Sequence, residues 1–263
     1  MSSVSPPTPE SARDPGFPPI RQVDALRPLH WLRQGWADLW ACPLPGLLHG
    51  VAAALFGGLL LALARHHYWL LAGAFSGFLL VAPIIATGLY AVSRERELGR
   101  PANLATALGA WRPRDHRLVM FGLLLALSGT GWVVTSGSVV TLLSGPTVVT
   151  PADFVQQVVL ASDTYLFEVW LVLGAFMAAP IFASTVATIG LLLDRPYTLR
   201  DSVLLSVRTV MFNPVPMALW ACLILLLTVL GGLPLLLGLV VVVPWLAHAS
   251  WHAYRDLLPA SGD

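Results

Sequence analysis

The sequence contains no lysine, and charged residues of every kind make up only 11% of its 263 residues. All 15 basic residues are arginines, and the formal net charge is +1 at pH 7. With 56% hydrophobic residues and a mean hydropathy of +0.74, the chain has too little polar surface to cover a water-soluble globule. We therefore expect the lipid bilayer as its surroundings and no nucleic-acid partner.

Cysteine and recognisable catalytic motifs are also scarce. Cys42 and Cys222 form no C-x-x-C pair and fall at or inside apolar runs, so they predict neither a disulfide framework nor a zinc site. The sequence has no H-E-x-x-H, no phosphate-binding G-x-x-x-x-G-K-[ST] and no G-x-S-x-G motif. We expect a protein that is not an enzyme and whose sequence requires no cofactor.

What the sequence does have is long apolar runs. A helix of about 20 apolar residues crosses a hydrocarbon core roughly 30 Å thick, and six runs qualify or nearly qualify. They cover residues 45–64, 68–92, 118–143, 166–192, 215–231 and 234–253. A Gly/Pro cluster at residues 231–234 separates the last two, which predicts a tight helical hairpin. The expected fold class is an all-α membrane protein with six transmembrane helices.

The arginines predict which side each loop faces, because short loops rich in arginine stay in the cytoplasm. With both termini in the cytoplasm, only Arg65 would lie on the outer side. We expect a Pro/Ser-rich, disordered tail over residues 1–25, one membrane domain over 26–257 and a short tail over 258–263.

Three segments of the chain are similar to one another. A-P-I-I-A from Ala82, A-P-I-F-A from Ala179 and V-P-W-L-A from Val243 align, so Pro83, Pro180 and Pro244 match. Proline inside a membrane helix bends it, which predicts three equivalent kinks. We expect three repeat units, about 27–99, 100–194 and 195–257, although apolar sequences also resemble one another by chance.

Each unit begins with a segment of helical amphipathicity, expected to lie on the cytoplasmic membrane surface. The apolar positions are Leu29, Leu32, Trp36 and Leu39 in the first segment, Leu104, Leu108 and Trp111 in the second, and Val203, Val207 and Val210 in the third. C-P-L-P at Cys42 and N-P-V-P at Asn213 mark the step into a span, and Thr198 with Asp201 fits a capping box. The expected interface anchors are Trp31, Trp36, Trp40, Trp111, Trp251, Tyr254 and Arg255.

Three histidines form the one group of side chains in the sequence that could bind a metal or haem. His248 and His252 are spaced i, i+4 and share a helix face, and His49 lies at a comparable depth in the first span. If the first and sixth spans are neighbours, the three imidazoles could converge on haem iron, copper or another metal. The competing interpretation is structural, with the histidines bonding neighbouring helices or anchoring a helix end at the interface.

The third unit carries the clearest family resemblance. The runs R-T-V-M-F-N-P-V-P from Arg208 and V-V-V-P-W-L-A-H-A-S-W-H-A-Y-R-D-L from Val241 resemble the bacterial integral membrane family known as domain of unknown function 2189. W-L-R-Q-G-W-A-D-L-W from Trp31 and G-L-Y-A-V-S-R-E-R-E-L-G-R-P from Gly88 are also similar, so the resemblance extends over nearly the whole chain. It implies a multi-pass protein of the bacterial inner membrane, and no established activity.

Three functions are compatible with these features. The first is a non-enzymatic accessory, assembly or scaffold protein that binds another membrane complex. The second is a small-solute transporter or channel whose three repeats enclose a path. The third is a haem- or copper-handling protein that uses His49, His248 and His252.

Overall fold

The structure, a computed structural model, describes residues 17–64, 86–110, 116–143, 148, 150–161 and 164–259. Over these residues it contains helices and loops and no strand, which confirms the expected all-α class. Most of the N-terminal tail and of the expected second span lie outside the described residues. So do Pro83 and Trp111.

The helices range in length from 4 residues to 28. They are α1 (Arg27–Ala41), α2 (Pro43–Ala64), α4 (Leu104–Gly109), α5 (His116–Leu143), α6 (Pro151–Phe154), the π-helical η1 (Val155–Val159), α7 (Leu166–Thr185), α8 (Thr188–Asp194), α9 (Leu199–Phe212), α10 (Pro214–Gly232) and α11 (Leu239–Leu257). A further helical segment covers residues 86–97, ahead of α4.

Four segments of the described chain are long and apolar enough to cross a membrane. They are Pro43–Ala62, His116–Leu143, Leu166–Asp194 and Pro214–Gly232. These correspond to the first, third, fourth and fifth expected spans. Their surfaces are strongly apolar, with exposed fractions of 69% at Leu55, 69% at Leu127, 77% at Phe176 and 67% at Leu225. Side chains of this kind fit a hydrocarbon environment.

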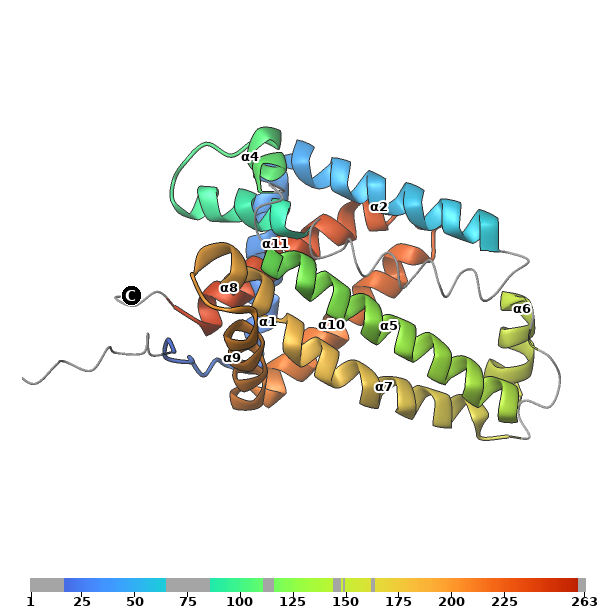
Figure 1. The fold of residues 1–263 in the computed structure, drawn as a ribbon. Helices are drawn as coiled ribbons and strands as arrows, with labels where there is room; N and C mark the ends of the chain where they lie inside the picture. Colours follow the sequence, from blue (N-terminus) through green and yellow to red (C-terminus); the bar gives the residue numbers. More distant parts are fainter. Residues whose placement is uncertain are drawn as a thin grey trace, which may run out of the picture.

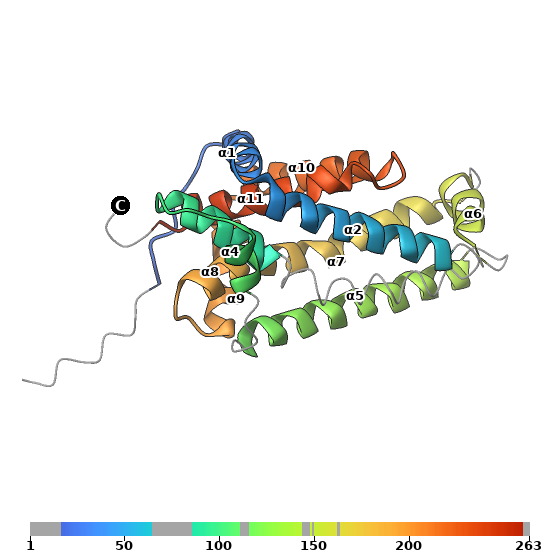
Figure 2. The same cartoon turned by 90° about the horizontal axis from the view of Figure 1, so that it is seen from above.

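The long helices run alongside one another, and the short ones gather at their ends (Figures 1 and 2). α1, α4, α8 and α9 surround one end of the molecule together with the C-terminal part of α11, whereas α6 lies at the opposite end (Figure 1). Both ends of the described chain are at the first of these ends, because the Arg21 amide donates a 2.9 Å hydrogen bond to the Leu257 carbonyl.

The sixth expected span differs from its prediction over residues 234–253. Residues 233–238 form turns in which Leu235 and Leu236 have positive φ angles of 50° and 66°. Helix α11 then begins at Leu239, and it is not among the four candidate spans. Its C-terminal half is polar and buried against neighbouring helices, as described below, which lowers its hydropathy without exposing it.

The transitions between short and long helices are as expected. A single residue separates α1 from α2 at Cys42 and α9 from α10 at Asn213, and each is followed by the proline that starts the long helix. Cys42 (φ −140°, ψ 69°) and Asn213 (φ −130°, ψ 52°) have similar backbone conformations. The Thr198 side chain accepts a 3.1 Å hydrogen bond from the Asp201 amide, so the expected cap of α9 is confirmed.

The inward face of α9 is not the valine face that the sequence suggests. Ser202, Leu205, Ser206 and Thr209 are the buried residues of this helix, whereas the expected valines are only partly buried. The Ser206 hydroxyl donates to the Ala183 carbonyl and accepts from the Ala187 amide, at 2.7 and 3.1 Å. Small hydroxyl side chains let α9 approach α7 closely while their polar groups stay bonded.

Helix α11 lies at the centre of the packing. A Cβ atom on Gly35 of α1 would lie 2.5 Å from the Ala249 backbone nitrogen, so α1 and α11 cross in direct contact. Gly50 of α2 meets the Val240 backbone, and Gly190 of α8 meets the Tyr254 ring. The main buried core therefore surrounds the second half of α11, at the end of the molecule where the short helices meet.

Candidate functional site

The candidate site is a set of charged side chains around the C-terminal half of α11. Asp38 of α1 is its most connected member, with a side chain that is only 10% exposed. Its Oδ1 accepts a 2.9 Å hydrogen bond from Arg96 Nε, and its Oδ2 lies 2.6 Å from the Ser93 hydroxyl and 2.8 Å from His252 Nε2. One carboxylate thus joins α1, α11 and the helix over residues 86–97.

These partners keep Asp38 ionised. Burial by itself raises the pKa of a carboxyl group, but hydrogen bonds from His252, Ser93 and Arg96 outweigh burial and lower the pKa of Asp38 to about 2. At neutral pH the carboxylate is therefore an acceptor on both oxygens. This charge state determines the direction of the hydrogen bonds around it.

Asp256, near the end of α11, holds a second set of partners. It pairs with Arg21 and Arg27, and its Oδ2 accepts a 2.8 Å hydrogen bond from the Trp31 indole. Burial raises the pKa of Asp256, and hydrogen bonds from Arg27 and Trp31 lower it by more, so the net shift is downward. The Asp256 side chain is only 9% exposed, so its carboxylate is largely shielded from solvent.

Glu97 and Asp194 bring two more segments to α11. Glu97 accepts hydrogen bonds from the Trp251 indole at 3.0 Å and from Arg255 Nε at 2.9 Å. Asp194, the last residue of α8, pairs with Arg94 at 2.9 Å and accepts a 3.1 Å hydrogen bond from the Tyr254 hydroxyl. Burial raises the pKa of Tyr254, so its hydroxyl remains a donor.

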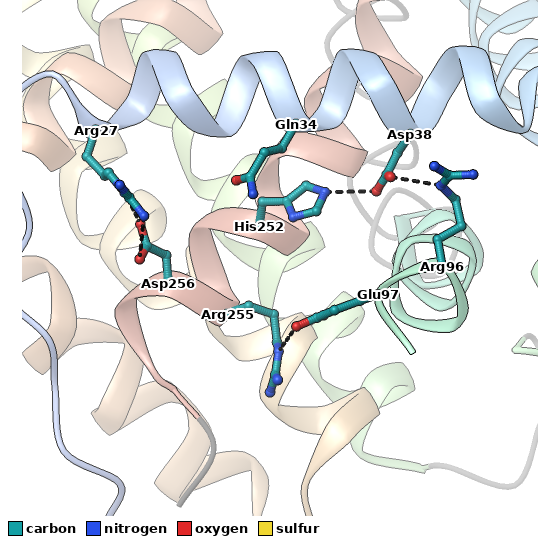
Figure 3. Close-up of a pocket in the computed structure, with 8 residues that line it drawn as sticks. All are labelled: Arg27, Gln34, Asp38, Arg96, Glu97, His252, Arg255 and Asp256. Atoms are coloured by element: carbon teal, nitrogen blue, oxygen red, sulfur yellow. Dashed lines mark hydrogen bonds and ion pairs between the residues drawn. The ribbon is translucent and has the colours of Figure 1, made fainter. Parts of the chain in front are cut away.

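Several of these side chains line an open polar pocket with a volume of about 300 Å³. Its lining residues are Arg27, Gln34, Asp38, Arg96, Glu97, His252, Arg255 and Asp256 (Figure 3). Gln34 and Asp38 extend from α1, and His252 lies between them (Figure 3). Each charged residue in the lining pairs with another charged residue of the chain, so the wall of the pocket carries both signs of charge.

Two of the three candidate histidines share one cluster of side chains, and the third makes its hydrogen bond elsewhere. α2 does pack against α11, as the convergence hypothesis requires. His252 contacts Asp38 directly, and His248 contacts it through Ser93, whose hydroxyl lies 2.8 Å from His248 Nδ1. His49 Nδ1 instead donates to the Pro45 carbonyl of its own helix, at 2.6 Å. No group of three or more His, Cys, Asp or Glu side chains in the described part of the chain is arranged to hold a metal ion. Metal or haem binding stays a prediction.

The expected interface anchors fall into two groups. Trp36 and Trp40 are 42% and 49% exposed and contact each other, with 5.5 Å between their ring centroids. Trp31, Trp251 and Tyr254 are at most 1% exposed, because their rings fill the core and their polar atoms bond the carboxylates described above. The structure therefore places these three inside the protein, and Arg255 beside them in ion pairs.

Two of the three matched prolines lie in the described part of the chain. Pro180 is inside α7 and Pro244 is inside α11. The α7 helix ends at Thr185, and α8 begins at Thr188 after a short turn. The fourth expected span is thus made of two helices, with the break five residues after Pro180.

Sequence reasoning did not find the carboxylates that organise the site. In the sequence, Asp38 falls on the polar face of an amphipathic segment, and Glu97 falls in a charged segment between apolar runs. Nothing in the sequence distinguishes these two carboxylates from ordinary solvent-exposed ones. The available signal was the run S-R-E-R-E from Ser93, which places alternating charges directly after an apolar run. The arginines that pair with these carboxylates come from other segments, so the ion pairs can be identified only in the folded protein.

Comparison with known proteins agrees with this architecture. Residues 70–194 match the model of a family described as a predicted integral membrane protein, DUF2189. No curated protein and no solved structure matches the chain. The matched segment contains the motif at Gly88 but neither the opening motif at Trp31 nor the runs from Arg208 and Val241, so it is narrower than the resemblance suggested. Residues 70–194 are therefore similar to the predicted integral membrane protein family DUF2189, and the match covers just under half of the chain.

Proposed function

We propose that this protein is a non-enzymatic accessory or scaffold protein that binds another complex in the bacterial inner membrane. The observation that carries the proposal is the contrast between its two kinds of surface. The charged groups at the α11 end pair with one another inside the chain. The long helices, in contrast, present extensive apolar surface, and in α7 only Leu166 is buried.

This separation of internally paired charges from exposed apolar surface suits a protein whose long helices contact lipid and neighbouring membrane helices. Apolar side chains in a bilayer gain nothing from the hydrophobic effect when they meet another helix, so association there depends on close packing. The ion pairs at the α11 end hold α1, α8 and α11 in fixed positions. They therefore stabilise a rigid platform on which such packing surfaces keep their shape.

The proposed topology has six spans, with both termini and all three amphipathic helices in the cytoplasm. The similar backbone conformations at Cys42 and Asn213 support a repeated unit made of a short surface helix and a long helix. The arginine distribution supports the sidedness. A reporter enzyme fused after Gly145 should be active in the periplasm, and cytoplasmic activity there would contradict six spans.

The decisive experiment is recovery of the protein from native membranes under mild detergent, with an affinity tag at the N-terminus. The tag avoids the C-terminal side because Leu257 and Leu258 are fully buried. We expect a second membrane protein in constant ratio to the tagged chain. Photo-crosslinking amino acids at Leu55, Leu127, Phe176 and Leu225 then identify the contact surface.

The control position for crosslinking is Phe121, which is 2% exposed and lies in the same helix as Leu127. We expect at least one exposed position to crosslink to the partner and Phe121 to give none. Recovery of the chain alone, with every exposed position crosslinking only to lipid, would contradict an accessory role.

A transporter or channel is the second candidate, and the open polar pocket favours it. Purified protein in proteoliposomes would then move a small polar solute or ion. Filling the pocket through Gln34→Trp should abolish that flux, whereas Trp36→Phe, on the outer side of the same helix, should preserve it.

A further inference from the structure

The arginines of the described chain differ in how their charge is compensated. Several pair with carboxylates, as Arg96 does with Asp38. Arg200 and Arg208, on the exposed side of α9, have no carboxylate partner within the described ranges. These two positive charges therefore face the surroundings of the protein without a counter-charge from the residues described.

The exposed face of α9 combines these two arginines with large apolar side chains. Leu204, Met211 and Phe212 are exposed. Spacings of three and four residues place them on the same side of the helix as Arg200 and Arg208. The opposite side carries the buried hydroxyl residues that contact α7. One helix face therefore offers both apolar contact and positive charge, a combination that is typical of helices lying in the interface of a bilayer.

The position of α9 brings this face to the start of a span. α9 lies across the end of the long helices instead of continuing their direction (Figure 1). Asn213 holds the turn into α10, because its buried side chain donates to the Thr209 carbonyl at 3.1 Å and accepts from the Val23 amide at 3.0 Å. The α10 candidate span begins at Pro214. The apolar end of the face, at Phe212, therefore adjoins the point where the chain enters an apolar helix.

Arg208 is held against an aromatic ring, which leaves its hydrogen-bond donors available. Its guanidinium carbon lies over the Phe17 ring, 5.3 Å from the centroid, and the Phe17 ring lies 6.2 Å from that of Tyr197. In the part of the chain that is described, Arg208 donates no hydrogen bond. The planar edge of a guanidinium matches two oxygens of a phosphate group. Arg208 is therefore positioned to donate to a phosphate.

The exposed face of α1 shows the same pattern at the same end of the molecule. Arg33 is exposed and has no carboxylate partner among the residues described. Leu29, Trp36 and Trp40 are exposed, and they lie four, three and seven residues from Arg33, on its side of the helix. Two separate surface helices thus present unpaired arginine among apolar side chains.

We propose that the exposed faces of α9 and α1 bind negatively charged phospholipids, with Arg200, Arg208 and Arg33 on the lipid phosphates. The neighbouring apolar side chains would lie among the first carbons of the acyl chains. Charge complementarity selects this occupant, because a lipid of net negative charge attracts an unpaired arginine more strongly than a zwitterionic lipid, whose ammonium group offsets its phosphate. This inference is independent of the accessory role, since it concerns lipid and requires no second protein.

The test is native mass spectrometry of the full-length protein in detergent, titrated with phosphatidylglycerol or with phosphatidylcholine of the same acyl chains. We expect phosphatidylglycerol to bind about tenfold or more tightly. One arginine near an anionic lipid surface contributes roughly fivefold to binding. Arg208→Gln should therefore weaken phosphatidylglycerol binding by about fivefold and leave phosphatidylcholine binding within about twofold.

Arg100→Gln is the matched control, because it removes one exposed arginine that already pairs with a carboxylate, that of Glu95. It should leave the binding of both lipids unchanged. If Arg208→Gln fails to fold, Arg200→Gln on the same face serves for the same comparison.

Three results would overturn the proposal. The first is equal affinity of the unmodified protein for the two lipids. The second is an equal loss of phosphatidylglycerol binding in Arg100→Gln and Arg208→Gln, which would mean that net charge alone decides binding. The third is displacement of phosphatidylglycerol by soluble glycerol phosphate at a similar concentration, which would mean that the face binds free phosphate groups and not a membrane lipid.

Discussion

Oδ2 of Asp38 lies 2.8 Å from Nε2 of His252, although 214 residues separate them in the sequence. This contact joins the first described helix to the last. It also places the imidazole of His252 between the Asp38 carboxylate and the Gln34 side chain in the pocket wall (Figure 3). The same carboxylate oxygen accepts the Ser93 hydroxyl, so a change at Asp38 affects three segments at once.

Replacing Asp38 by asparagine should destabilise the protein by about 2–4 kcal/mol, because Arg96 then loses its carboxylate partner in a largely buried place. The measurement is thermal unfolding in detergent micelles, followed by tryptophan fluorescence. Asp201→Asn is the matched control, since the Asp201 carboxylate accepts a hydrogen bond from the Thr198 hydroxyl on the exposed surface. It should cost no more than about 1 kcal/mol. Equal losses in the two variants would show that Asp38 is not the central carboxylate.

Stability should fall in acid through the same residue. The pKa of Asp38 is about 2 in the folded protein and 3.8 as its ordinary value, so the folded state binds its proton less readily than the unfolded state. The stabilisation is fully present above about pH 4 and is lost as the pH falls towards 2, by about 2 kcal/mol at most. The midpoint of unfolding, measured between pH 6 and pH 2, should therefore drop less steeply in Asp38→Asn. A parallel fall in both proteins would exclude this cause.

Adding one methyl group at Gly35 should push α1 away from α11. A Cβ atom there would lie 2.5 Å from the backbone nitrogen and 2.8 Å from the Cα of Ala249, atoms that cannot move aside separately. We expect Gly35→Ala to cost about 1–3 kcal/mol, as overpacking does. Gly58→Ala in α2 adds the same group where nothing lies within 4 Å. Helix propensity predicts a neutral or slightly stabilising effect there, so an unchanged midpoint in both variants would argue against the close crossing.

Tryptophan fluorescence should distinguish the lipid-facing side of α1 from its buried side. Brominated lipids quench tryptophan fluorescence on contact, so Trp36→Phe and Trp40→Phe should reduce the quenched fraction. Trp31→Phe should leave it unchanged, because Trp31 is fully buried against Trp220, with 5.8 Å between the ring centroids. Quenching that depends on Trp31 would mean that α1 presents its other face to the bilayer.

The sequence by itself determined the features that depend on local chemistry. Apolar runs of sufficient length predicted four segments that the structure presents as candidate spans, because the requirement for internal backbone hydrogen bonds in lipid makes such runs helical. Proline after Cys42 and after Asn213 predicted both helix boundaries, since proline lacks the amide that the preceding helix would need and suits the first turn of the next. The cap at Thr198 was predicted for the same local reason.

Only the tertiary structure decided which polar residues are buried. Trp251, Tyr254 and Arg255 have the composition of an interface anchor, and α11 as a whole resembles a short span. The fold instead surrounds this half of α11 with Asp38, Glu97 and Asp194, each from a different segment, so its polar atoms are bonded inside the protein. Helical periodicity shows which residues share a face, but it carries no information on the partner of that face, and here the partner determined the role of every residue in the site.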